Sequence, residues 1–159
     1  WNTLPNSLFS EAYRGLKFYN DSLNGFVDVR DVARCMHALM NSPIVNERFI
    51  VSAENLSFRE VLWMMADALH VKRPGIKAGH LLLQIAWIME AVKGLVTGTK
   101  PTITKESIAI ASVPFRYSNQ KICEALPYRF YPVKKTIEDT AAAFLESEKK
   151  GLNFGILPI

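Results

Sequence analysis

Cysteine is scarce in this sequence of 159 residues, which contains only Cys35 and Cys123. The two lie far apart and form no C-x-x-C pattern, so a disulfide scaffold and a cysteine-based zinc site are excluded. The three histidines, His37, His70 and His80, are separated from one another and from both cysteines. Surface or partly buried histidines are therefore favoured over metal ligands. We expect no metal site, and we expect the chain in a reducing compartment, the cytoplasm.

A glycine-rich phosphate loop is also missing from the sequence. The eight glycines form neither G-x-G-x-x-G nor G-x-x-x-x-G-K-[ST], the two patterns that bring backbone amides against phosphate groups. The sequence therefore contains no cofactor-binding residues of known pattern. We expect no cofactor to bind to this chain by itself.

Charge of one sign is nowhere concentrated. The chain carries 19 Lys and Arg against 15 Asp and Glu, a formal net charge of +4. The longest runs of like charge are the pairs Lys134-Lys135 and Lys149-Lys150. This distribution is too thin for the basic surface of a nucleic-acid-binding protein, so no nucleic-acid partner is expected.

The sequence lacks a secretory leader and a clear membrane span. No basic segment followed by an apolar core comes after Trp1, and a chain that begins with Trp rather than Met is expected to be processed or to be a piece of something longer. Residues 81–96 are apolar but include Gln84, Glu90 and Lys93, and they fall short of the ~20 apolar residues that a bilayer requires. They predict a helix packed within the protein or at a subunit contact, so no membrane partner is expected.

Two strand–helix units are the clearest local pattern that is present. Residues 25–29 predict a short strand, followed by a helix over 32–41 with Asp31 as its N-cap. Residues 48–53 predict the strongest strand, followed by a helix over 57–69 that begins with the capping box Ser-Phe-Arg-Glu. A strand followed by a helix, twice over, predicts part of a parallel α/β sheet.

The remaining sequence is mostly helical in pattern. Further helices are predicted over residues 8–16, 81–96, 104–112, 119–126 and 132–151, before an apolar tail over 152–159. The expected fold class is therefore α/β and helix-rich, with about six helices and few parallel strands. Two strand–helix units make a poor parallel sheet alone, which is a second indication that residues 1–151 belong to something larger.

Two patterns resemble acid–base chemistry. Asp28 and Asp31 are close in sequence, but the helix-cap interpretation of Asp31 is favoured over a paired-carboxylate site. Tyr-x-x-x-Lys, which on a helix places an ammonium beside a phenol and lowers its pKa, occurs at Tyr13, Tyr117 and Tyr131. Because three of the five tyrosines carry the pattern, it has little specificity, and no catalytic residue is assigned.

Three stretches carry a resemblance to a known family. GFVDVRDVA (residues 25–33) resembles a strand-to-helix motif in the second half of the extended short-chain dehydrogenases/reductases, the NAD(P)-dependent epimerase, dehydratase and dihydroflavonol-reductase group. RFIVSAENLSFREV (48–61) resembles the next strand and helix of that group. YSNQKICEALPYRFYPVKKTIEDTAAAF (117–144) is similar to its closing segment. The resemblance extends from residue 1 to about residue 151.

The resemblance implies the C-terminal, substrate-side portion of a Rossmann-like enzyme. In that family the glycine loop and the catalytic Ser, Tyr and Lys precede the part that this chain resembles. The implied parent protein binds NAD or NADP and acts on a small molecule, a ketone or a secondary alcohol. Asn24 and Gly25 stand where sugar-nucleotide epimerases often have Arg-Asp, which favours the dihydroflavonol-reductase-like branch.

The same portion of the fold contains candidate residues for the wall of a substrate site. Ligands in open α/β folds sit outside the carboxyl ends of the strands. An apolar wall with a few polar groups is expected there, and its candidate residues are Trp1, Asn2, Ser7, Tyr19, Phe26 and Asp28. For each of them, ordinary surface or core packing is the alternative.

Two other functions remain open at this point. One is a non-enzymatic relative that senses a dinucleotide or binds a protein through residues 81–96, and the other is an unrelated helical interaction domain. If the first interpretation holds, the chain alone is catalytically silent. It is then also expected to associate with itself, because its strands would lack neighbours.

Overall fold

The computed structural model describes residues 4–79 and 115–150. Its elements are, in chain order, α1 (Leu4–Tyr13), β1 (Phe18–Tyr19), β2 (Leu23–Phe26), α2 (Val29–Met40), β3 (Glu54–Ser57), α3 (Phe58–Ala68), β4 (Ile76–Lys77), α6 (Gln120–Ala125) and α7 (Val133–Lys149). The helix-rich α/β class predicted from the sequence is confirmed. The helices predicted over 81–96 and 104–112 and the apolar tail 152–159 lie outside the described residues.

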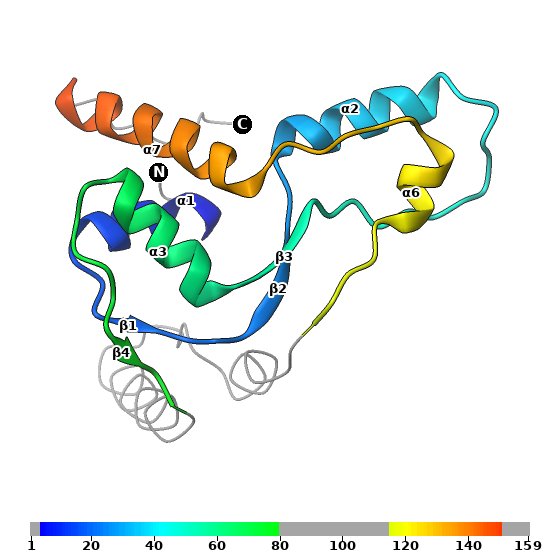
Figure 1. The fold of residues 1–159 in the computed structure, drawn as a ribbon. Coiled ribbons are helices and arrows are strands. Elements are labelled where there is room, and N and C mark those ends of the chain that lie inside the picture. The colour runs from blue at the N-terminus through cyan, green and yellow to red at the C-terminus, as the bar shows by residue number, and fades with distance from the viewer. Residues whose placement is uncertain (1–3, 80–114, 151–159) are drawn as a thin grey trace, which may run out of the picture.

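The described helices form two groups, which the β2–β3 pair joins (Figure 1). Helices α1, α3 and α7 enclose the larger apolar core, where Phe9, Val61, Met65 and Phe144 are buried together. Helices α2 and α6 lie at the other end of the molecule, around a smaller cluster with Cys35 at its centre. The two cores share no buried side chain, so polar contacts at the junction between them determine how the groups sit.

The strands differ from the sequence prediction in position and direction. The strand predicted over 25–29 is β2, which begins earlier and ends at Phe26. It pairs antiparallel with β3, with Leu23 opposite Ser57 and Phe26 opposite Glu54. The prediction that the two strand–helix units form a parallel sheet is therefore wrong. In the described residues, parallel pairing occurs between the two-residue strands β1 and β4.

Residues 48–53, predicted as the strongest strand, are not a strand. Their composition favours extended backbone, but a strand also requires a neighbour for its amides and carbonyls. The antiparallel hydrogen bonding to β2 begins only with the amide of Ala53, which donates to the carbonyl of Phe26 at 2.8 Å. Phe49 and Val51 instead pack against the smaller cluster. The strand that pairs with β2 is consequently β3, which follows directly after residues 48–53.

Helix α2 begins three residues earlier than predicted, and Asp28 rather than Asp31 is its N-cap. The backbone of Asp28 is extended, with φ −73° and ψ 136°. Its carboxylate accepts a hydrogen bond from the amide of Arg30 at 2.7 Å, as an N-cap residue does. Asp31 lies in the first turn of the helix and is fully buried, so the prediction that Asp31 caps the helix is wrong.

Helices α3 and α7 agree closely with the sequence pattern. The capping box of α3 is complete: the amide of Glu60 donates to the Ser57 hydroxyl at 3.2 Å, and the amide of Ser57 donates to the Glu60 carboxylate at 2.8 Å. The predicted apolar stripe of α7 is the face that enters the larger core. Helix α7 starts one residue later than predicted, with Pro132 as its N-cap. In the part of the chain that the structure describes, no helix is long and apolar enough to span a bilayer.

Gly25 is required by a close approach between β2 and residues 115–119. That segment runs beside β2 and β3: the Phe115 amide donates to the Leu23 carbonyl at 3.1 Å, and the Asn55 side chain exchanges two hydrogen bonds with the backbone of Tyr117. A Cβ atom on Gly25 would lie 2.7 Å from the Ser52 hydroxyl and 2.7 Å from the Tyr117 ring. The absence of a side chain therefore lets the segment lie against β2.

Gly25→Ala should destabilise the protein, because overpacking of this kind costs about 1–3 kcal/mol. Gly75→Ala is the matched control, since nothing lies within 4 Å of a Cβ atom at that position. Urea unfolding of both variants measures the difference. Equal stabilities would show that the segment can move away from β2 without cost.

Candidate functional site

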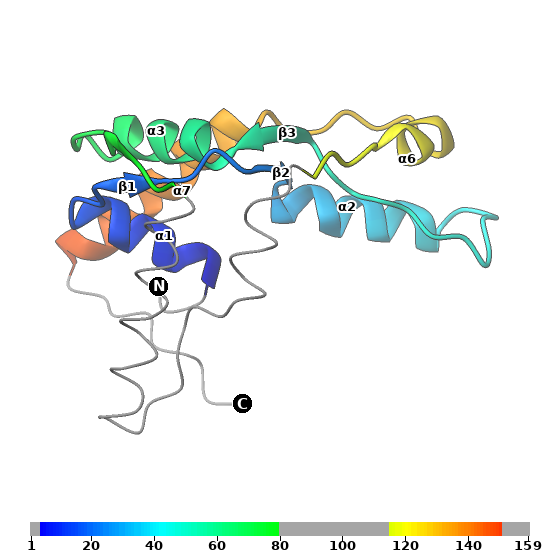
Figure 2. The ribbon, with the colours of Figure 1, turned by 90° about the horizontal axis from the view of Figure 1, so that it is seen from below.

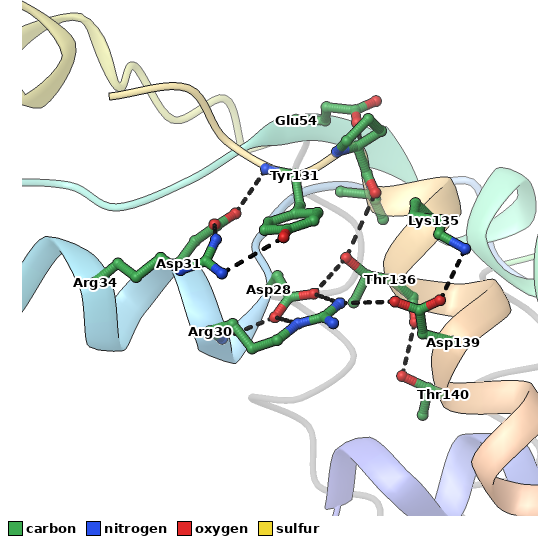
Figure 3. Close-up of polar contacts among 12 residues, drawn as sticks. Asp28, Arg30, Asp31, Arg34, Glu54, Tyr131, Lys135, Thr136, Asp139 and Thr140 are labelled. Atoms are coloured by element: carbon green, nitrogen blue, oxygen red, sulfur yellow. Dashed lines mark hydrogen bonds and ion pairs between the residues drawn. The ribbon is translucent and has the colours of Figure 1, made fainter. Parts of the chain in front are cut away.

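The most elaborate polar arrangement in the described residues lies at the start of α2, where the two groups of helices meet (Figure 3). Asp28 is at its centre and is 2% exposed. The guanidinium of Arg30 donates to both oxygens of this carboxylate, at 3.0 and 2.7 Å. The hydroxyl of Thr136, on α7, donates to the second oxygen at 2.8 Å. The N-cap of α2 is thereby tied to the first turn of α7.

Arg30 extends this connection along α7. Its guanidinium lies between Asp28 and Asp139, and it donates to the Asp139 carboxylate at 3.0 Å. Lys135, one turn before Asp139, forms an ion pair with the same carboxylate at 3.0 Å. Asp139 and Lys135 are partly open to solvent, so these outer ion pairs stabilise the structure modestly. The inner bonds to the buried Asp28 are the stronger constraint.

Asp31 makes a second connection, to the segment that leads into α7. One carboxylate oxygen accepts a short hydrogen bond from the Tyr128 hydroxyl. The other accepts from the backbone amide of Tyr131 at 2.8 Å. Because Asp31 is completely buried, its oxygens rely on these donors in place of water. Residues about 100 positions apart in the sequence are thus held together by one side chain.

Two arginines stack on a single aromatic ring beside this carboxylate. The guanidinium carbons of Arg30 and Arg34 each lie 4.9 Å from the centroid of the Tyr131 ring. This distance is within the range of cation–π attraction. The name junction cluster is used below for Asp28, Asp31, Arg30, Arg34, Tyr128, Tyr131, Thr136 and Asp139.

Hydrogen bonds, neighbouring charges and burial shift the pKa values of three members of the junction cluster. The hydrogen bonds from Arg30 hold the pKa of Asp28 well below its usual range, against the effect of burial. The Lys135 ammonium and then Arg30 lower the pKa of Asp139. Burial, followed by donation to Asp31, raises the pKa of Tyr128. Asp28 is therefore ionised at neutral pH, and both of its oxygens accept hydrogen bonds. These properties suit a group that positions other residues and not a proton donor.

The structure describes only some of the residues predicted to line a substrate. Trp1 and Asn2 lie outside the described residues. Tyr19 and Phe26 are half-buried and pack against the larger core, where their rings meet Trp63 and Phe58 edge-on at 6.4 and 5.6 Å.

The two polar candidates lie on other elements than these rings. Ser7 is half-buried on α1, and Asp28 belongs to the junction cluster. Contact of these side chains, and of Tyr19 and Phe26, with a substrate stays a prediction.

The three Tyr-x-x-x-Lys patterns do not form phenol–ammonium pairs. Helix α1 ends at Tyr13, so Lys17 is not on the same helix. The ammonium of Lys121 pairs with Glu47 at 2.6 Å, and that of Lys135 pairs with Asp139. Within residues 4–79 and 115–150, no lysine forms a hydrogen bond to the tyrosine of its own pattern.

A shallow groove of about 500 Å³ runs between α3 and α7. Its lining combines apolar side chains such as Met64 and Leu145 with the charged side chains of Asp67, Lys134 and Glu138. The carboxylate of Asp67 accepts two hydrogen bonds from the guanidinium of Arg73, both at 2.7 Å. In the described part of the chain, no group of three or more His, Cys, Asp or Glu side chains is placed to hold a metal ion.

Sequence reasoning found Asp28 and Asp31 but not their partners. The available signal was the spacing D-x-R-D at a helix start, with one carboxylate at the N-cap and one in the first turn. The Tyr128–Tyr131 segment could not be linked to it from sequence, because a contact across about 100 residues leaves no local pattern. Thr136 was missed for the same reason.

Comparisons with known proteins show a shared fold and no family. No family model matches the sequence, and no curated protein matches it. A crystal structure of gox2253 superposes on 91% of the chain with a TM-score of 0.71 and 21% sequence identity. The chain spans 44% of the length of gox2253. The likeness establishes that the two proteins share this fold.

Asp31→Ala should cost more than the loss of a helix cap. The change leaves the Tyr131 amide and the Tyr128 hydroxyl without their acceptor, and each buried unpaired group costs about 1–3 kcal/mol, against about 1 kcal/mol for a lost N-cap. Asp31→Asn is the control, because its amide can accept from the Tyr131 amide and donate to the Tyr128 oxygen. Urea unfolding of both variants gives the values. A loss of 1 kcal/mol or less for Asp31→Ala would contradict the structure.

Asp28 should make stability depend on pH in the acid range. Its pKa is lower in the folded than in the unfolded chain, so its contribution is present above the unfolded pKa of about 3.9 and is lost as pH falls below it. Asp28→Asn keeps a capping side chain but removes this titration. Urea unfolding between pH ~7 and ~2.5 should therefore show a shallower acid decline for the variant. Parallel declines would mean that Asp28 is not held by Arg30.

Proposed function

We propose that this chain is the substrate-side portion of an NAD(P)-dependent oxidoreductase or epimerase that acts on a ketone or a secondary alcohol. The observation that carries the proposal is the segment GFVDVRDVA, which resembles the extended short-chain dehydrogenases/reductases and runs from β2 into α2. Both of its aspartates are used structurally. A motif whose acidic residues hold an element in place fits a supporting half better than a reacting centre.

The extent of the chain relative to gox2253 supports the same proposal. A fold that spans 44% of a longer chain fits a protein in which another portion supplies the nucleotide site. NAD or NADP would then be held by that other portion, since the sequence of this chain has no phosphate loop. Backbone amides at a helix N-terminus supply much of the pyrophosphate binding in such proteins.

In this proposal the junction cluster positions the carboxyl end of β2. Phe26 lies two residues before Asp28, at the carboxyl end of β2. The bonds from Asp28 to Arg30 and Thr136 fix that end of the strand against α7. Phe26 and Tyr19 would form the apolar wall for the substrate, and Asp28 would support the wall from behind. The hydride transfer and the proton transfer would be performed by residues of the other portion.

The chain alone should bind neither NADH nor NADPH. Energy transfer from its three tryptophans to the reduced nicotinamide reports binding, and micromolar affinity would require about 8 kcal/mol of net interactions. We expect no saturable signal in that range. The polypeptide of the complete reading frame, assayed beside it, should oxidise reduced cofactor in the presence of a ketone.

Two results would contradict the proposal. Micromolar cofactor binding by the 159-residue chain, or turnover that Tyr13→Phe abolishes, would place the active site within it. Failure of the complete polypeptide to bind either dinucleotide would remove the oxidoreductase assignment altogether.

A further inference from the structure

Asn24 is the only asparagine in the sequence that a glycine follows. Both residues lie in β2, and the backbone amide of Gly25 donates to the side-chain oxygen of Asn24 at 2.9 Å. The nitrogen of Gly25 therefore lies beside the carbonyl carbon of the Asn24 side chain. In this arrangement an asparagine can lose its side-chain amide, because the following backbone nitrogen can attack that carbon.

The backbone amide of Gly25 points away from β3. In an antiparallel pair, successive residues direct their backbone groups alternately toward the partner strand and away from it. The Phe58 amide donates to the Ser22 carbonyl at 3.1 Å, so Leu23 and Gly25 direct theirs to the other side. On that side runs the segment 115–119 (Figure 2), and its Phe115 amide donates to the Leu23 carbonyl. The Gly25 amide is held instead by the side chain of the preceding residue.

The position also allows the attacking nitrogen to approach. Gly25 has no side chain to hinder contact between its own backbone and a neighbouring group. Closing a ring between the two residues requires their peptide bond to turn out of the strand. β2 has four residues, all of them half-buried, and segments with few buried contacts open locally at low cost in free energy. The reaction is therefore limited by local opening of β2.

We propose that Asn24 is a modification site, at which the folded protein loses ammonia spontaneously and forms isoaspartate and aspartate. The Gly25 nitrogen gives up its proton and forms a bond to the side-chain carbonyl carbon of Asn24. The bond from that carbon to Nδ2 breaks, and ammonia leaves with the proton, so the product is a cyclic imide. Water then opens the imide. Cleavage at the former side-chain carbon gives aspartate, and cleavage at the backbone carbonyl carbon gives isoaspartate.

The two products differ in their effect on β2. Aspartate keeps an oxygen that accepts from the Gly25 amide. Isoaspartate carries the backbone through the former side chain and adds one methylene before Gly25. A Cβ atom on Gly25 would already lie 2.7 Å from the Ser52 hydroxyl and 2.7 Å from the Tyr117 ring, so a displaced backbone has little room. The isoaspartate form should therefore pair less well with β3 and with the segment 115–119.

Peptide mapping by mass spectrometry tests the proposal on the purified, folded chain after incubation at mildly alkaline pH. We expect loss of ammonia at Asn24 at least about tenfold faster than at Asn55, a barrier lower by about 1.4 kcal/mol. Asn55 is a control within the same sample, because its side chain is held by two hydrogen bonds to the backbone of Tyr117. Asn41 is a second control, since the amide of the residue after it donates to the Leu39 carbonyl at 3.1 Å.

Two variants separate the chemistry from its consequence. Asn24→Gln keeps an amide at the position but requires a larger ring, so it should stay unmodified. Asn24→Asp matches the aspartate product and should unfold at the same urea concentration as wild type. The isolated isoaspartate form should unfold at a lower one, and equal midpoints would contradict the expected effect on β2.

Three results would overturn the proposed site. Loss of ammonia at Asn24 only in the urea-unfolded chain would show that the folded strand protects it. Aspartate without isoaspartate would exclude attack by Gly25, because direct hydrolysis by water gives aspartate alone. A rate at Asn24 equal to that at Asn55 would show that the arrangement in β2 gives no acceleration. None of these measurements involves a cofactor, so the function proposed above is tested separately.

Discussion

The buried carboxylate of Asp31 is the constraint on which the arrangement of the molecule depends. It has no exposure to solvent, and it receives hydrogen bonds from the side chain of Tyr128 and the backbone of Tyr131. A carboxylate in this position is costly unless its acceptors are filled. The chain segment before α7 must therefore lie beside the first turn of α2, and the two apolar cores, which share no buried side chain, are fixed relative to each other.

Asp28 links the same junction to the β2–β3 pair. It lies two residues after the end of β2, caps α2 and accepts from Thr136 on α7. The carboxylate of Glu54 on β3 accepts from the amide of Val133 at 2.8 Å. Both strands are thus held at the N-terminal end of α7. This geometry gives Phe26 a fixed position, which a substrate wall requires and which ordinary core packing also explains.

Most local features of this fold were predictable, although the N-cap of α2 is Asp28 and not Asp31 as predicted. The pairing of distant segments was not predictable. The capping box at Ser57 and the apolar stripe of α7 follow from spacing within one or two helical turns, and both are correct. The direction of the β2–β3 pair and the displacement of the strand from 48–53 to 54–57 depend on which backbone finds a partner, and composition does not encode that choice. For Asp31, the residue was identified and its role was not, because its partners lie about 100 residues away.

The energetic coupling between Asp31 and Tyr128 tests the central claim most directly. Unfolding free energies of wild type, Asp31→Ala, Tyr128→Phe and the double variant form a thermodynamic cycle. Residues in direct contact within one buried network show coupling of about 0.5–3 kcal/mol, and the account predicts at least about 1 kcal/mol for this pair, because each single change removes the same buried hydrogen bond. Additive effects, with coupling below about 0.5 kcal/mol, would contradict it.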